Sequence, residues 1–455
     1  MPQTFSKRLW ASIDRYLPSS AEGDVLVAFS GGLDSTVLLH ALASGPQSDR
    51  RLRAVHVNHQ LHADAMLWQA HCERVAADLR VPFSSHVVTV PEIPEEGLES
   101  AARHVRHEAL RAELRSGEIL LTAHHADDQL ETVLLALLRG SGVDGLAAMP
   151  RVQRFGLGWH VRPMLECTRD EIAVYARECG LAWLDDPSND NTRFDRNYLR
   201  RDVVPKLRAR WPSAAHMAVR TAAHLGEAAG LLDEIAAHDF AVAAVSGCLK
   251  VSVLRSLDPA RRRNLLRYWL HSRGARAPST RKLAGLEHDM LVADEDRSPC
   301  VEWDDIEVRR HRDLLYCLPR MPACDSTETS WSWTSPLTLA AGLGLLRAEI
   351  AHGQGLALAK LPQEISIRPR VGGETLRLPG QGHHRELKKL LQEAHVLPWW
   401  RDRIPLLFAG NRLIAVADLW IVADYAASGD EEGMCIVWDG RPPIDGVSVA
   451  RQLLT

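Results

Sequence analysis

The stretch Asp24–His40, DVLVAFSGGLDSTVLLH, constrains the fold of this chain more than any other part of its sequence. It begins with the continuous apolar run 25–29, and such a run is typical of a strand buried on both faces of a parallel sheet. Ser30, Gly31 and Gly32 then turn the chain into a helix. Two glycines allow backbone N–H groups to point into one concavity, and the helix N-terminus adds positive charge. The stretch therefore predicts a phosphate site, although an ordinary glycine-rich turn is the simpler alternative.

A carboxylate and several hydroxyls add chemistry to this turn. Asp34 would repel a bound phosphate unless a divalent cation lay between them, so the loop predicts a nucleotide with Mg²⁺, for which Asp34 is a ligand. No Gly-Lys-Ser/Thr follows the glycines, so this is not a Walker A loop and γ-phosphate transfer is not indicated. The predicted nucleotide-binding residues of the loop are Ser30, Gly31, Gly32, Leu33, Asp34 and Ser35.

The residues after this loop alternate strand-like and helix-like runs. Strands are expected at 52–59, 86–90 and 118–125, with Ala-rich helices around 63–80 and 99–116. This alternation is the pattern of an α/β domain whose parallel sheet is covered by helices. Ligands of such sheets bind outside the carboxyl ends of the strands, so polar residues at these ends should converge on one crevice.

Polar residues occur at two further places where they could face this crevice. Asn58 and His59 end the second strand and could hold the adenine or the adjacent phosphate; a solvated strand edge is the alternative. Arg103 and Arg106 lie three residues apart on the third helix and so share one face. Arg103 could stabilise negative charge that grows on transferring phosphates, or it could belong to a solvated basic face.

A second motif, T-A-H-H-A-D-D-Q-L-E-T, crosses from the fourth strand into a helix. His124 and His125 end the strand, and Asp127 and Asp128 occupy the first helical turn, where carboxylates suit the helix dipole. Glu131 shares a face with these acids, so they either repel or enclose a positive group. A capping cluster is one alternative. A metal site is another, in which Mg²⁺ takes Asp128 and leaves His124 for hydrogen bonding.

Length and composition place these motifs in a larger chain. At 455 residues, about three domains are expected. The predicted divisions are 1–211, the catalytic domain; 212–324, mainly helical; 325–362, a linker that starts rich in Ser, Thr and Pro; and 363–455, a small α+β domain. No membrane span or signal-peptide pattern is present, so a cytoplasmic protein is expected. The eight cysteines form no C-x-x-C pair, which argues against a zinc ribbon, an iron–sulfur site and a disulfide framework.

A nucleic-acid partner would have to bind local basic patches, because the net charge is −4. Three such patches are apparent, one in each predicted domain, although a basic stripe on a helix is often only a solvated face. The candidate RNA contacts are Arg196, Arg200, Arg201, Lys206 and Arg208 in the first, Arg261 and Arg262 in the second, and Lys388 and Arg401 in the last.

Together these motifs carry a resemblance. S-G-G-L-D-S alone resembles the signature of the PP-loop ATP pyrophosphatases. T-A-H-H-A-D-D-Q-L-E-T, R-G-S-G-V-D-G-L, R-N-Y-L-R and the carboxyl-terminal L-K-K-L-L-Q-E-A and P-W-W-R-D-R-I-P-L-L narrow it to the tRNA(Ile)-lysidine synthase family. The resemblance implies a PP-loop (adenine nucleotide alpha-hydrolase-like) α/β domain, then a helical domain and a small C-terminal α+β domain.

The resemblance also implies a two-step ligation that consumes ATP, with Mg²⁺, and joins lysine to the wobble cytidine of an isoleucine tRNA with a CAU anticodon. ATP would adenylate the C2 oxygen and release pyrophosphate, and the lysine amine would then displace AMP. The Ser30–Ser35 loop would hold the pyrophosphate. Asp127, Asp128 or Glu131 would bind the ammonium and take its proton, Asp127 being the first choice, and His124 would orient ligands.

Three other functions are weighed against this one. A tRNA thiolase shares the loop but typically carries paired cysteines, which this chain lacks. A PP-loop amide synthetase for small molecules would not need basic regions and a terminal domain. A non-catalytic tRNA-binding protein would not need the full set of Ser30, Asp34, Asp127 and Asp128.

Overall fold

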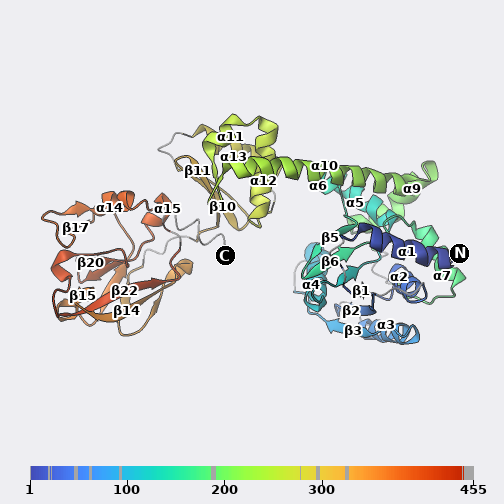
Figure 1. Cartoon of the computed structure of the whole chain (residues 1–455), viewed down its shortest axis with the longest axis horizontal. Helices are drawn as coiled ribbons and strands as arrows, with labels where there is room; N and C mark the ends of the chain where they lie inside the picture. The colour runs from blue at the N-terminus through green and yellow to red at the C-terminus, as the bar shows by residue number, and fades with distance from the viewer. Residues whose placement is uncertain are drawn as a thin grey trace. The chain divides into compact units, whose positions relative to one another are not determined.

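The structure is a computed structural model in which the chain forms two compact units, Met1–Leu231 and Leu232–Thr455 (Figure 1). Each unit is described by itself. The described residues are 2–18, 21, 23–45, 50–60, 64–91, 95–185, 191–276, 278–293, 298–322, 327–442 and 444.

The first unit is built on a six-stranded sheet with the order β3-β2-β1-β4-β6-β5. All neighbouring strands are parallel except the edge pair β5 and β6. The strands are β1 (Val25–Ala28), β2 (Leu52–Asn58), β3 (Phe83–Val87), β4 (Ile119–Leu121), β5 (Val152–Phe155) and β6 (Gly158–Val161). The expected parallel α/β architecture is therefore confirmed. The third strand begins earlier than expected, the fourth is shorter, and the β5–β6 hairpin was not anticipated.

Helices cover both faces of this sheet, which explains the unbroken apolar run of β1. Val25 and Val27 pack into a core with α1 (Pro2–Tyr16), α2 (Leu33–Ala43), α3 (Ala65–Asp78) and α7 (Arg169–Glu178). Leu26 faces the other way, into a core formed with α4 (Glu95–Glu113). The position of Thr168 before an amphipathic run predicts that it is the N-cap of a helix, and Thr168 does cap α7, in a capping box with Glu171.

The strand order places the two sequence motifs side by side. β1 pairs with β2 on one side and with β4 on the other, so the chain reverses its direction of travel across the sheet between β1 and β4. The carboxyl ends of the strands on either side of such a switch point form the crevice in which open α/β sheets bind ligands. The glycine loop follows β1, and the two histidines follow β4.

A group of helices follows the second motif. They are α5 (Ala126–Leu138), α6 (Val143–Leu146), α8 (Asp195–Tyr198), the π-helical turn η2 (Leu199–Val203), α9 (Val204–Arg210) and α10 (Ala214–Ala243). Ala126 and Leu130 of α5 pack with Val204 of α9 and with Ala218 of α10. This packing brings residues 195–210 against α5.

The second unit begins with helices and a sheet. The helices are α11 (Val251–Ser256), α12 (Pro259–Ser272) and α13 (Thr280–Val292). The sheet, of order β7-β8-β11-β10-β9, contains β7 (Ala244–Val245), β8 (Cys248–Lys250), β9 (Cys300–Trp303), β10 (Ile306–His311) and β11 (Leu314–Pro319). Val308 and Leu315 of this sheet pack with Trp269 of α12. The helices are as expected for 212–324, but the sheet was missed because its strands are short.

The remaining strands form two sheets and a short ribbon, with two short helices. The sheets have the orders β12-β16-β19-β20-β21 and β13-β14-β22-β15, and β17 pairs with β18. The elements are β12 (Thr329–Trp331), β13 (Leu337–Thr338), η3 (Ala340–Gly342), β14 (Leu345–His352), β15 (Leu356–Ala357), η4 (Leu358–Lys360), β16 (Ile365–Arg368), β17 (Thr375–Leu376), β18 (Arg385–Glu386), α14 (Leu387–Glu393), α15 (Pro398–Arg401), β19 (Leu406–Ala409), β20 (Arg412–Val416), β21 (Trp420–Ile421), η5 (Ala423–Tyr425) and β22 (Glu432–Asp439). The sequence predicts a basic amphipathic helix at 387–396 and a hairpin turn at Gly410 and Asn411; α14 and the β19–β20 hairpin are both present.

The expectation of a linker at 325–362 is wrong. β14 lies in this segment and pairs antiparallel with β22 along its whole length. Leu346 and Leu356 are fully buried in the core of this part. The polar residues that suggested a linker precede β14. The composition of the first residues of 325–362 therefore did not represent the whole segment.

No helix among the described residues is long and apolar enough to cross a membrane.

Leu346 provides a test of this correction. We expect Leu346→Ala to lower the free energy of unfolding by about 2–5 kcal/mol, because it empties a buried site in the core. Ile350→Ala is the control, since Ile350 lies on the same strand but its side chain is 54% exposed. Urea denaturation followed by tryptophan fluorescence measures both changes. Equal, small losses in the two variants would restore the linker interpretation.

Candidate active site

The glycine loop between β1 and α2 is held open by hydroxyl contacts. The Ser30 N–H donates to Ser35 Oγ at 3.2 Å, and Ser35 Oγ donates to the Gly32 carbonyl at 3.1 Å. Gly31 has a φ of +82°, and a Cβ there would lie 2.8 Å from Cys72 Sγ, so this position requires glycine. Gly32 is the N-cap residue of α2 and provides no side-chain cap, which leaves N–H groups of the first turn available to an anion.

Asp34 lies in the first turn of α2, beside these N–H groups. Its Oδ2 lies 3.7 Å from His125 Nε2. Its Oδ1 is buried and has no hydrogen-bond partner among the described residues. A buried carboxylate oxygen without a partner is costly, and a hard cation such as Mg²⁺ would satisfy it. The residues present therefore fit a divalent cation at Asp34.

His125 joins the glycine loop to the second motif. It is the N-cap residue of α5. The backbone N–H of His125 donates to Asp128 Oδ2 at 3.1 Å, and the backbone N–H of Asp128 donates to the ring Nδ1 of His125 at 3.4 Å. Its Nε2 lies 3.4 Å from Asp128 Oδ2 as well as near Asp34. Burial lowers the pKa of His125, but the negative charges of Asp128 and Asp34 outweigh burial and raise this pKa above its ordinary value.

Two arginines satisfy the acids of α5. Glu131, whose side chain is 2% exposed, accepts from Arg196 Nε at 2.8 Å and from Arg200 Nε at 2.7 Å. Asp128 Oδ1 accepts from Arg200 Nη2 at 2.9 Å and from Arg196 Nη2 at 3.2 Å. Burial would raise the pKa of Asp128, but His125 and then Arg196 hold it well below its usual range. The positive group that the spacing of these acids requires is thus supplied by the chain itself.

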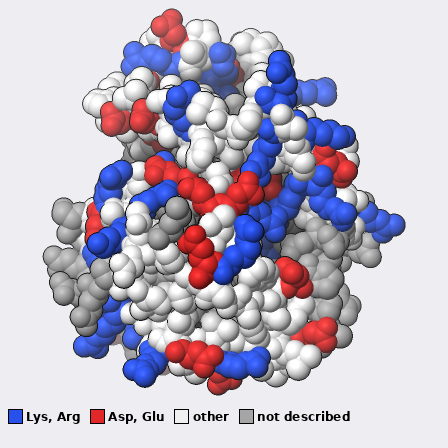
Figure 2. All heavy atoms as spheres, turned by 90° about the vertical axis from the view of Figure 1, so that its right-hand side faces the viewer, with Lys and Arg blue, Asp and Glu red and all other residues white. Residues whose placement is uncertain are grey.

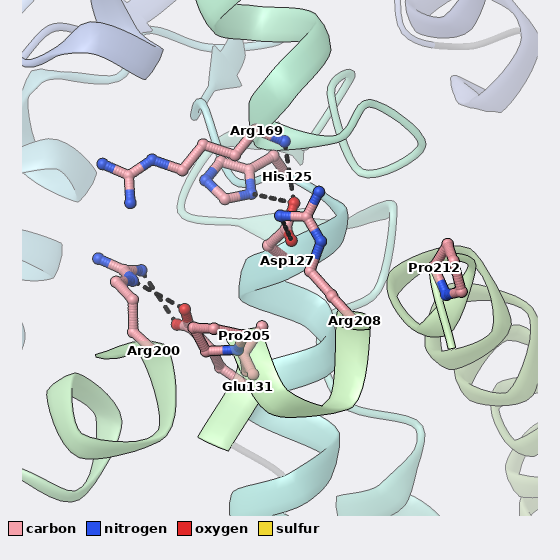
Figure 3. Close-up of a pocket in the computed structure, with 9 residues that line it drawn as sticks. His125, Asp127, Glu131, Arg169, Arg200, Pro205, Arg208 and Pro212 are labelled. Carbon is pink, nitrogen blue, oxygen red and sulfur yellow. Dashed lines mark hydrogen bonds and ion pairs between the residues drawn. The ribbon is translucent and has the colours of Figure 1, made fainter. Parts of the chain in front are cut away.

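Asp127 faces a different set of partners on the other side of α5. Its Oδ2 accepts from the Arg169 N–H at 2.9 Å, and its Oδ1 lies 3.4 Å from Arg208 Nη1. These contacts tie α5 to the start of α7 and to α9. A cavity of about 410 Å³ lies here, lined by His125, Asp127, Glu131, Arg169, Arg200, Val204, Pro205, Arg208 and Pro212. Figure 3 is a close-up of these residues, and acids and arginines are both among them.

The residues at the end of β2 have separate environments. The Asn58 amide donates to Gln69 Oε1 at 3.0 Å, and its Oδ1 accepts from the Gln60 N–H at 3.0 Å. Both ends of this carboxamide therefore have partners within the chain, and a contact of Asn58 with the nucleotide stays a prediction. His59 Nδ1 is buried without a hydrogen-bond partner among the described residues. Burial, and then the charge of Arg106, lower the pKa of His59 to about 4.

Arg103 and His124 lie near a cluster that sequence analysis missed, which consists of Thr122, His160 and Arg162. Arg103 is exposed on α4, and its charge contributes to the low pKa values of His107 and His160. His124 bonds to Thr122, which also bonds to buried His160. The position of Arg162 in the sequence could have revealed this cluster, because Arg162 directly follows β6 and so lies at the same sheet edge as His124.

Four of the basic residues predicted to contact RNA are exposed: Arg201, Lys206, Arg261 and Lys388. Six of the predicted residues, Arg261 among them, have acidic or carbonyl partners within the chain: Arg196 and Arg200 with Glu131, Arg208 with Asp127 and Asp170, Arg261 with Asp239, Arg262 with Glu287, and Arg401 with the Val396 carbonyl. On the face drawn in Figure 2, Lys and Arg side chains lie among Asp and Glu rather than in one continuous basic patch. The first stripe is therefore largely an ion-paired segment and not a solvated basic face.

A mainly parallel sheet with a glycine loop and a helix N-terminus at its switch point, and with Asp34 in the first turn of that helix, is the arrangement expected of an ATP-using PP-loop domain. The family model of the PP-loop domain matches residues 5–207, that of the TilS substrate binding domain matches 249–316, and that of the TilS substrate C-terminal domain matches 365–438. The chain belongs to the tRNA(Ile)-lysidine synthase family, whose members are carbon–nitrogen ligases.

Similarity to individual tRNA(Ile)-lysidine synthases supports this family assignment. The tRNA(Ile)-lysidine synthase of Coxiella burnetii is 40% identical over 93% of this chain and 94% of its own length. That of Methylococcus capsulatus is 41% identical over 90% of this chain and 95% of its own length. That of Shigella flexneri is 40% identical over 94% and 98% of the two chains. The likeness thus extends across both compact units.

The ion pairs of Glu131 can be tested by stability. We expect Glu131→Gln to cost about 3 kcal/mol of unfolding free energy, because it leaves two partly buried arginines short of one negative charge. Glu166→Gln is the matched control: Glu166 lies 2.7 Å from Arg151 but is 48% exposed, so its loss should cost less than about 1 kcal/mol. Urea denaturation compares the variants. If Glu131→Gln costs no more than the control, the cluster does not hold the segment in place.

Proposed function

We propose that this chain joins lysine to C2 of the wobble cytidine of an isoleucine tRNA with a CAU anticodon, using ATP and Mg²⁺. The cytidine O2 attacks the α-phosphorus and pyrophosphate leaves; the lysine amine then attacks C2, AMP leaves with the O2 oxygen, and the amine loses a proton. The observation that carries the proposal is the 3.7 Å approach of Asp34 to His125. This contact puts the phosphate loop and the acidic motif, which such a reaction needs together, in one crevice.

The glycine loop suits the leaving pyrophosphate. Its backbone N–H groups and the N-terminus of α2 are fixed donors that stabilise negative charge where it develops. Asp34 would hold Mg²⁺, and the bound ion would offset charge on the phosphates. Asp128, the other predicted metal ligand, is already paired with Arg196 and Arg200, so Asp34 is the preferred ligand. His59 is a candidate for contact with the nucleotide, since its Nδ1 is buried and lacks a partner among the described residues.

The cavity beside α5 suits free lysine. Lysine carries a carboxylate and two amines, and the cavity offers Arg169 and Arg208 as well as Asp127 and Glu131. An ordinary lysine amine has a pKa of about 10.4, so it must lose a proton before it can attack. Asp127 is the proposed base. Asp128 and Glu131 already share two arginines, which leaves Asp127 the less fully neutralised acid.

The exposed basic residues suit the tRNA. Arg201 and Lys206 follow the ion-paired turn on the surface of the first unit, and Lys388 is exposed on α14. Cations of this kind bind phosphates of an RNA backbone without reading its bases. The wobble base would be displaced from its stack to reach the crevice. The substrates of this reaction place the protein in the cytoplasm.

The proposal predicts a defined dependence on substrates. Pyrophosphate release from ATP and Mg²⁺ should require unmodified tRNA(Ile) with a CAU anticodon, and lysine should be incorporated only when all components are present. Radiolabelled lysine on the tRNA and a coupled pyrophosphate assay measure the two steps. A methionine tRNA with the same anticodon is the control. Pyrophosphate release without tRNA, or no labelled tRNA with all components present, would contradict the proposal.

A substitution of Asp34 distinguishes a loss of catalysis from a loss of tRNA binding. Asp34→Ala should lower the rate of tRNA-dependent pyrophosphate release by at least about 100-fold, because the phosphates lose the carboxylate that holds their cation. The affinity for tRNA in a filter-binding assay should change little. Asp14→Ala is the control, since Asp14 is a 66% exposed acid on α1 of the same unit. Loss of tRNA binding together with activity would mean that Asp34 maintains the fold instead.

A further inference from the structure

A line of hydrogen bonds runs behind His124, away from the acidic motif. His124 Nδ1 lies 2.8 Å from Thr122 Oγ1, and the same hydroxyl lies 2.8 Å from His160 Nε2. His160 Nδ1 lies 3.3 Å from Arg162 Nη2. Arg162 is anchored in turn, because its Nη1 donates to the Pro150 carbonyl at 2.7 Å. His160 is 1% exposed and Arg162 is 5% exposed, so the far end of the line is closed to solvent.

The chemistry of these groups determines which atom donates and which accepts at the Arg162 end of the line. A guanidinium can only donate, so His160 Nδ1 must accept from Arg162. Burial, and then the charge of Arg162, lower the pKa of His160 to about 2, so this ring is neutral and carries its one proton on Nε2. That proton is donated to Thr122 Oγ1. With one lone pair of the hydroxyl used by His160, its single proton is available for His124 Nδ1, which accepts it when His124 carries its own proton on Nε2.

The end of the line is therefore a neutral His124, and the line favours the tautomer in which Thr122 uses the Nδ1 lone pair and the proton is on Nε2. Burial is the main cause that lowers the pKa of His124 to about 3. The charge of Asp128 favours protonation, and the charges of Arg162, Arg196 and Arg106 oppose it. A ring in this state can donate a hydrogen bond from Nε2, but it has no free lone pair with which to take a proton.

We propose that Thr122, His160 and Arg162 are positioning residues that fix His124 as a hydrogen-bond donor to a phosphate oxygen of ATP, and that His124 is not the base of the reaction. The proposal rests on the proposed function, because it assigns the role of His124 within the adenylation step. It also leaves deprotonation of the lysine amine to the acids of α5.

A phosphate oxygen is the acceptor that the surroundings favour. His124 follows β4, which pairs with β1, and the glycine loop follows β1 at the same sheet edge. Arg106, Arg162 and Arg196 act on His124 against the charge of Asp128, so three cations lie close enough to meet a phosphate there. When the cytidine O2 attacks the α-phosphorus, negative charge grows on the phosphate oxygens. A neutral, fixed donor stabilises this charge without having to give up a proton.

Two substitutions of His124 distinguish a donor from a base. His124→Gln keeps an N–H near the position of Nε2 but cannot act as a base, whereas His124→Ala keeps neither. We expect the rate of tRNA-dependent pyrophosphate release to fall by about 100-fold or more in His124→Ala, as for loss of one fixed donor. His124→Gln should remain within about 10-fold of the wild type. Equal losses in the two variants would overturn the proposal.

Thr122 tests the positioning role with a matched pair. Thr122→Val is isosteric but lacks the hydroxyl, and Thr122→Ser retains it. Partners that orient a metal-bound histidine are typically worth about 10- to 100-fold, and we expect a loss of kcat in this range for Thr122→Val. KM values for ATP and tRNA should be unchanged, and Thr122→Ser should restore kcat. Similar kcat values for Thr122→Val and the wild type would overturn the proposal.

The tautomer itself can be measured without activity. In a long-range ¹H–¹⁵N spectrum of ¹⁵N-histidine-labelled full-length protein, the signals absent from His124→Gln identify His124. A protonated Nε2 and an unprotonated Nδ1 support the proposal, and the opposite tautomer or a charged ring overturns it. If the wild type shows no tRNA-dependent pyrophosphate release, the proposed function fails, and the spectrum still reports whether the line of hydrogen bonds exists.

Discussion

The ion pairs between α5 and the segment that follows α7 are the interaction on which the site depends. Asp128 and Glu131 are buried at the start of α5, and two uncompensated carboxylates could not remain charged there. Arg196 and Arg200 lie one turn apart and reach both acids. The acids and the arginines are distant in sequence, so this cluster holds the segment against the motif. The arrangement fixes the wall of the cavity before any substrate binds.

His125 extends this constraint to the nucleotide loop. Its side chain caps α5, and the same ring lies between Asp34 and Asp128. The contact is possible because β1 and β4 are neighbours in the sheet, so that two loops far apart in the sequence start side by side. A buried ring between two carboxylates is a fixed spacer that separates the cation site at Asp34 from the arginine-bound acids.

Sequence reasoning succeeded where local chemistry determines structure. The apolar run of β1, the glycine turn and the Thr168 cap depend on residues close in sequence, and each is present. It failed where a partner lies far away. The spacing of Arg196 and Arg200 is the same for a solvated stripe and for an ion-paired one, and only the fold brings Glu131 to them. β14 was assigned to a linker because its partner β22 lies much later in the chain.

The partners of the four acids in the site distinguish the roles that we propose for them. Asp128 and Glu131 are neutralised by two arginines, so a third cation would gain little from them. Asp34 has one buried oxygen without a partner among the described residues. Asp127 faces the cavity, and its partners are the Arg169 N–H, Arg208 and His125, whose Nδ1 lies 3.8 Å from Asp127 Oδ2. Asp34 is thus the acid proposed for the metal, and Asp127 the acid proposed for the lysine amine. The paired acids serve to hold the arginines, and with them the cavity wall, in place.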